Sequence, residues 1–87
     1  MKELSFVIKD KIGLHARPAG VLATNAKKFE CDITVRCGEK EASAKRLLSL
    51  MSLGAVKGSI LRFSFDGKDE DEALEKISEV LNEQLGK

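Results

Sequence analysis

The chain has 87 residues, of which 15 are lysine or arginine and 14 are aspartate or glutamate, so its formal net charge is +1. A chain of this length forms one small domain around one core, and we expect residues 1–87 to be a single domain. The balanced charge excludes a general electrostatic attraction to nucleic acid or to an anionic membrane surface.

The first predicted elements are a strand and a helix. Core-type side chains alternate with others from Leu4 to Ile8, which predicts a strand with one face on a core. The helix is expected to begin near Ala16, because Pro18 suits a first turn: its missing N–H would have no partner there. Apolar residues then recur at steps of three and four, as on one buried helix face: Ala19, Leu22, Ala23, Ala26 and Phe29.

The start of this helix holds the most informative residues of the sequence. His15, the only histidine, occupies the expected cap position, and Arg17 follows two residues later. The first N–H groups of a helix lack intrahelical partners, so the backbone of Ala16 and Arg17 could hold a phosphate beside His15, with the Arg17 side chain as a clamp. A neutral imidazole can also accept a transferred group. The pattern alone also fits a surface histidine that only caps a helix.

A hairpin is predicted next. Apolar and polar residues alternate from Cys31 to Cys37, Gly38 and Glu39 form a tight turn, and a short strand spans residues 40–44. The two cysteines would lie about 20 Å apart along one strand, beyond the reach of a disulfide. We expect both to be reduced, buried thiols, because no metal-type spacing connects them with His15.

Residues 45–53 are predicted to form a helix of about two turns that ends at Gly54 in a left-handed conformation. The apolar residues do not fit one stripe, since Leu47, Leu50 and Leu53 share one side and Leu48 and Met51 share a neighbouring side. We expect at least two of them to stay exposed, because so small a domain cannot cover both sides. The pattern also fits a fully buried helix.

The last strand and the last helix have clear signals. Leu61, Phe63 and Phe65 alternate with polar residues, and a turn follows at residues 66–68. The helix is expected to start at Asp69, which pairs with Glu72 in the manner of a capping box, and to stop at Gly86. Its apolar face comprises Ala73, Leu74, Ile77, Val80, Leu81 and Leu85.

These elements predict an α+β fold. Four strands with too few helices for parallel connections favour an antiparallel sheet that carries its helices on one face. No apolar run approaches the ~20 residues that span a bilayer, and the N-terminal residues lack the apolar region of a signal peptide. We therefore expect a cytoplasmic protein that does not insert into a membrane.

Two segments carry a resemblance to a known family. Residues 13–20, GLHARPAG, resemble the active-site segment of HPr, the histidine-containing phosphocarrier protein of the bacterial phosphotransferase system. Residues 51–54 and 57–58 resemble its second signature at matching spacing, and the likeness covers essentially the whole chain. The resemblance implies an open-faced β-sandwich, in which a four-stranded antiparallel sheet of order 1-4-2-3 carries three helices on one face.

The resemblance also implies roles for particular residues. His15 would accept a phosphoryl group on Nδ1 from Enzyme I and pass it to the IIA domains of sugar permeases, while Arg17 stabilises the phosphate. A docking surface for both partners would comprise Gly20, Thr24, Lys27, Arg46, Leu47, Leu48 and Met51. We expect a monomer that needs no metal or organic cofactor and binds no nucleic acid.

Arg46 departs from the family pattern. Many members have a serine there, which in Gram-positive bacteria is phosphorylated by a dedicated kinase, and arginine cannot accept that phosphate. We therefore expect a carrier without seryl regulation. A cation in the first turn of a helix costs about 0.3–1 kcal/mol, so we also expect either an acidic partner or a nearby carboxylate for Arg46.

Three functions fit these residues to different degrees. The leading interpretation is a stoichiometric phosphoryl carrier, which is not an enzyme because the partner's residues complete the chemistry. The alternative is a specialised regulatory relative whose phosphohistidine state controls a non-sugar partner. A small hydrolase with His15 as its base lacks a nucleophile and an orienting acid in the sequence.

Overall fold

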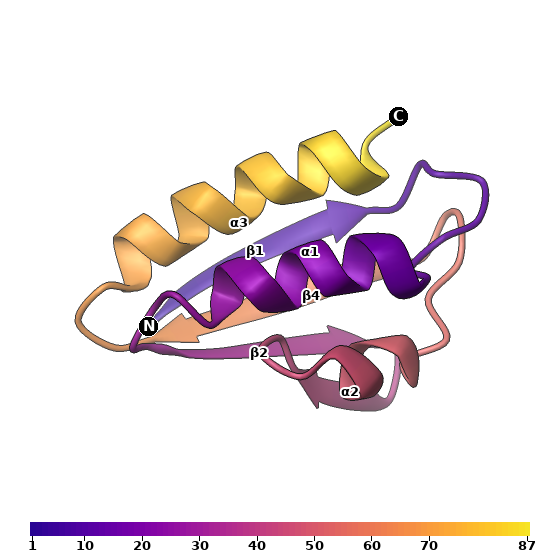
Figure 1. The fold of residues 1–87 in the computed structure, drawn as a ribbon. Helices are drawn as coiled ribbons and strands as arrows, with labels where there is room; N and C mark the ends of the chain where they lie inside the picture. Colours follow the sequence, from indigo (N-terminus) through magenta and orange to yellow (C-terminus); the bar gives the residue numbers. More distant parts are fainter.

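The computed structural model describes residues 1–87. Its strands form one antiparallel sheet in the order β1-β4-β2-β3, as predicted (Figure 1). The elements in chain order are β1 (Lys2–Val7), α1 (Ala16–Ala26), β2 (Asp32–Cys37), β3 (Lys40–Ser43), α2 (Leu47–Met51), β4 (Ile60–Asp66) and α3 (Glu70–Leu85).

All three helices cover the same face of the sheet (Figure 1). Strand alternation decides which side chains face them: Phe63 of β4 lies opposite Leu4 of β1 and Val35 of β2, and the three side chains share the covered face. Helices α1 and α3 lay their apolar stripes on this face and pack against each other. The result is a core cluster of 22 buried residues, and the opposite face of the sheet stays open, as expected for an open-faced sandwich.

Two features of the predicted helices differ from the structure, the end of α1 and the cap of α3. Helix α1 ends at Ala26, so Phe29 lies beyond it and packs against the core from the following turn. Helix α3 begins after Asp69 as expected, but the capping box is wrong: the Asp69 carboxylate makes no side-chain cap bond and instead accepts the N–H groups of Glu30 at 2.8 Å and Cys31 at 2.9 Å. Asp69 therefore ties α3 to the start of β2.

The two cysteines differ in their environments. Cys31 lies one residue before β2 and is buried, whereas Cys37 at the end of β2 is only half-buried, so the expectation of two buried thiols is correct for one of them. Both are free. None of the helices has the length and apolar character to span a bilayer.

Candidate functional site

The loop before α1 is fixed by contacts with the loop after α2. Leu14 N–H donates to Ala55 O at 3.0 Å. Gly13 adopts a φ of +83°, and a Cβ atom at this position would lie 2.6 Å from Ala55 O and 2.7 Å from Val56 Cα. Glycine is therefore required here both by conformation and by space. This contact brings together the two segments, residues 13–20 and 51–58, that carry the sequence signatures.

His15 lies at the start of α1 with its side chain partly open to solvent. It is the N-cap residue, with an extended backbone and no side-chain cap hydrogen bond, and its side chain is 37% exposed. The first intrahelical bond runs from Ala19 N–H to His15 O at 3.0 Å. The imidazole is therefore free to react, because the helix does not use it as a cap.

The first turn of α1 presents free hydrogen-bond donors beside His15. The N–H groups of Ala16 and Arg17 donate to no acceptor, and Pro18 has no N–H. No acidic residue occupies this turn, and the exposed Arg17 side chain makes no ion pair. Such a helix terminus attracts an anion through its unpaired donors and its partial positive charge.

An apolar patch lies on α2, which packs against α1. Leu48 is 79% exposed, and Leu47 and Met51 are each 39% exposed, whereas Leu50 and Leu53 are buried. The prediction that at least two large side chains stay accessible is thus confirmed, and the fully buried alternative is wrong. We call Leu47, Leu48 and Met51 the α2 patch. The α1 residues predicted to flank it are also accessible, with Gly20 half-buried and Thr24 and Lys27 exposed.

Sequence reasoning missed Asp10. One carboxylate oxygen, Oδ2, accepts the N–H groups of Ile12 at 3.1 Å and Gly13 at 3.2 Å, and it lies 3.9 Å from His15 Nε2. An aspartate three residues before a glycine is a common signal for such a turn. The sequence could therefore have predicted the turn, but not the approach to the imidazole.

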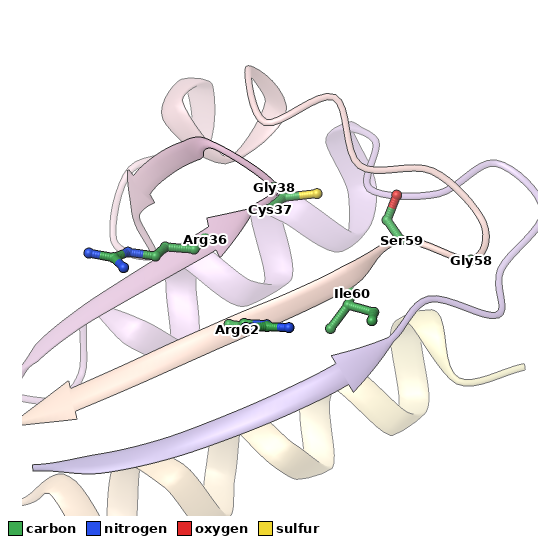
Figure 2. A pocket seen from close by; sticks show the side chains of 7 residues that line it. All are labelled: Arg36, Cys37, Gly38, Gly58, Ser59, Ile60 and Arg62. Carbon is green, nitrogen blue, oxygen red and sulfur yellow. The ribbon is translucent and has the colours of Figure 1, made fainter.

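The largest hollow of the surface lies elsewhere. It measures about 650 Å³ and lies between the end of β2 with its following turn and the start of β4 with its preceding loop; its lining includes Arg36, Ser59 and Arg62 (Figure 2). The Arg36 side chain is engaged in an ion pair with Glu41 at 2.8 Å. None of the predicted site residues lines this hollow, whereas part of the α2 patch lines a smaller hollow of about 330 Å³.

Comparison with known proteins identifies the family. A family model described as the PTS HPr component phosphorylation site matches residues 2–83. The chain belongs to the HPr family. The phosphocarrier protein HPr of Mycoplasma capricolum is 38% identical over 81 residues, which cover 93% of this chain and 91% of that protein.

Solved structures of HPr proteins share the fold. A crystal structure of HPr from Thermoanaerobacter tengcongensis is 38% identical, with a TM-score of 0.91 over 100% of this chain and 98% of that one. A crystal structure of the HPr dimer from the same organism gives a TM-score of 0.77 at 38% identity, with 100% of both chains covered. The resemblance seen in the sequence is thus confirmed, and the chain is an HPr phosphocarrier of the phosphotransferase system, which serves sugar transport.

Arg46 is one place where this HPr differs from what we expected. It is the N-cap of α2 rather than a residue of its first turn, its backbone is extended, and its side chain is exposed. The carboxylate expected beside it is absent, since Arg46 makes no ion pair. Helix α2 is also shorter than predicted, because only residues 47–51 are helical, although Gly54 is left-handed as expected with a φ of +65°.

Proposed function

We propose that this HPr accepts a phosphoryl group on Nδ1 of His15 from Enzyme I and passes it to the IIA domains of sugar permeases in the cytoplasm. The supporting observation is the partly exposed imidazole beside two unpaired N–H groups, those of Ala16 and Arg17. A phosphoryl group on His15 would bring several acceptor oxygens to these donors. Arg17, which has no other partner, would neutralise part of the charge.

The transfer needs little from the carrier itself. The Nδ1 lone pair attacks phosphorus, the P–N bond forms, and the bond to the donor breaks with its electron pair leaving on the donor. The reverse sequence loads the next acceptor. The chain offers positioning and electrostatic stabilisation, and residues of the partner complete the reaction, so the protein acts as a stoichiometric carrier.

Docking would use the α2 patch with the exposed face of α1. Leu47, Leu48 and Met51 supply apolar area, and a methionine adapts to more than one partner shape. Lys27 and Arg46 add unpaired positive charge around the patch. We propose that the working form is a monomer, because one surface must be free for each partner in turn.

Incubation with phosphoenolpyruvate and Enzyme I tests the proposal. Intact mass spectrometry should show a gain of one phosphoryl group that is labile in acid and absent from His15→Ala. Addition of a sugar IIA domain should then discharge the carrier. A phosphoryl group that persists in His15→Ala, or no gain in the natural protein, would refute the proposed role of His15.

Arg46 bears on regulation. We propose that this carrier lacks seryl control, because the side chain at this position has no hydroxyl group. Incubation with the HPr kinase and ATP should leave the natural protein unmodified, while Arg46→Ser should gain a phosphoserine and so show that the kinase is active. Phosphoserine in the natural protein, at Ser43, Ser49 or Ser52, would contradict the proposal.

The arginine that the natural protein has at position 46 also favours a second candidate function. In this function the protein is a regulatory relative whose phosphohistidine state controls a non-sugar partner. Transfer assays separate the two functions. Rapid passage of label from His15 to several sugar IIA domains is expected for the general carrier, whereas transfer to a single non-sugar protein is expected for the regulator.

A further inference from the structure

We propose that Asp10 is a positioning residue for phosphoryl transfer, because its carboxylate keeps the ring proton of His15 on Nε2 and leaves Nδ1 as the attacking atom. The inference rests on the proposed phosphorylation of His15. Asp10 Oδ2 lies 3.9 Å from His15 Nε2, and no other acidic side chain forms an ion pair with this histidine. The carboxylate therefore faces one particular nitrogen of the ring.

The chain holds this carboxylate in place before any partner arrives. Oδ2 accepts two backbone N–H groups, from Ile12 at 3.1 Å and from Gly13 at 3.2 Å, and Gly13 N–H also approaches Asp10 O at 3.2 Å. Gly13 in turn lies directly against Ala55, where not even a Cβ atom fits. Asp10 is thus fixed by the same loop that fixes His15, so the spacing between them is built into the fold.

The position of the carboxylate selects a tautomer. A neutral imidazole carries one proton, and the nitrogen without it has the nucleophilic lone pair. A negative charge near Nε2 stabilises the N–H at Nε2, since the positive end of that bond then faces the carboxylate. Nδ1 is left with its lone pair free, as the attack on phosphorus requires.

The same charge acts during transfer. When the P–Nδ1 bond forms and the donor's bond breaks, the ring keeps its Nε2 proton and gains a positive charge. Asp10 stabilises that charge across 3.9 Å and takes no proton itself. Loss of the phosphoryl group to an acceptor returns the ring to its neutral state. Because the side chains of His15 and Asp10 are 37% and 30% exposed, solvent screens this interaction in part and its effect is moderate.

The decisive variant is Asp10→Asn. Asparagine keeps a carbonyl oxygen that can accept the N–H groups of Ile12 and Gly13, so the turn persists while the charge is lost. Asp32→Asn is the matched control, since it removes the same charge from the exposed start of β2, at the far end of the sheet from His15. Both variants are compared with the natural protein in two measurements.

The first measurement is the rate of phosphorylation by Enzyme I and phosphoenolpyruvate. This rate should fall about five- to tenfold in Asp10→Asn, the size expected for a screened charge pair at this distance. It should stay unchanged in Asp32→Asn. The second is the ¹⁵N chemical shifts of His15 in the free protein at alkaline pH. These should show the proton mainly on Nε2 in the natural protein and a larger share on Nδ1 in Asp10→Asn.

The two measurements separate the possible failures. An unchanged or faster rate with unchanged nitrogen shifts in Asp10→Asn overturns the positioning role. A shifted tautomer with an unchanged rate also overturns it, because the ring proton would then not matter for transfer. If the natural protein accepts no phosphoryl group at all, the proposed function fails instead, and the nitrogen shifts still report whether Asp10 governs the ring.

Discussion

Replacement of Gly13 by alanine should destabilise the protein strongly. The residue combines a φ of +83° with a place where a Cβ atom would lie 2.6 Å from Ala55 O. The left-handed conformation costs an L-residue about 1–2 kcal/mol, and forced overpacking costs a further ~1–3 kcal/mol. We therefore expect Gly13→Ala to lower the free energy of unfolding by about 2–5 kcal/mol in total.

Two other glycines separate these contributions. Gly38 also has a positive φ, of +63°, but has nothing within 4 Å of a Cβ atom, so Gly38→Ala should show the conformational cost alone, ~1–2 kcal/mol. Gly20 lies within α1, also with nothing within 4 Å, so Gly20→Ala should stabilise the protein by about 0.5–1 kcal/mol.

Urea unfolding followed by far-ultraviolet circular dichroism measures all three variants. Thermal unfolding gives a second reading, since 1 kcal/mol corresponds to about 4–8 °C in a domain of this size. Gly13→Ala should also slow phosphorylation of His15, because the displaced loop loses the bond from Leu14 to Ala55. The reasoning is refuted if Gly13→Ala costs no more than Gly38→Ala, since the close approach to Ala55 would then contribute nothing.

Three further predictions concern other parts of the molecule. The N–H of Glu30 holds the pKa of Asp69 below its usual range. The stability contributed by this carboxylate is therefore present at neutral pH and is lost as pH falls below about 4. In urea titrations, Asp69→Asn should be less stable than the natural protein at pH 7 and should not show this loss of stability in acid. Burial, reinforced by Asp69, raises the pKa of the Cys31 thiol to about 11. A thiol reagent at pH 8 should therefore modify only Cys37 in the native protein and both cysteines in urea. Equal rates of modification of the two cysteines in the native protein would contradict the burial of Cys31. Leu48→Ala should change the free energy of unfolding by less than about 0.5 kcal/mol yet weaken binding to Enzyme I in calorimetry. Leu50→Ala, at a buried position, should instead lower the free energy of unfolding by ~2–5 kcal/mol. The α2 patch is not a docking surface if Leu48→Ala binds Enzyme I as tightly as the natural protein.

Local patterns in the sequence were enough to predict most elements and their buried faces. The alternation around Phe63 and the three-and-four spacing around Leu22 identify the core side of β4 and α1, since burial of one face requires those periods. Pro18 likewise indicated where α1 begins, and so where its unpaired N–H groups lie. The strand order came from the family resemblance, because alternation specifies which face is buried but not which strand is the neighbour.

The errors have a common physical origin in contacts between residues distant in sequence. Asp69 was expected to cap its own helix, but the N–H groups of Glu30 and Cys31, almost 40 positions away, take its carboxylate. Asp10 was overlooked because its approach to His15 depends on how the loop turns at Gly13, and Gly13 lies against Ala55, which is distant in sequence. Sequence rules compare only the hydrogen-bond partners that lie within about one turn of a side chain. They contain no information about partners that the fold brings close from a distant segment.

Helix α1 begins without the acceptor side chain that most helices have at that position, and this incompleteness has a thermodynamic consequence. A phosphoryl group on His15 would accept hydrogen bonds from the N–H groups of Ala16 and Arg17 and so act as the N-terminal cap of α1. A helix cap contributes about 0.5–2 kcal/mol, so the loaded protein should melt at a higher temperature than the empty one. The same stabilisation lowers the free energy of the loaded carrier, so it favours loading and has to be given up each time the phosphoryl group is delivered.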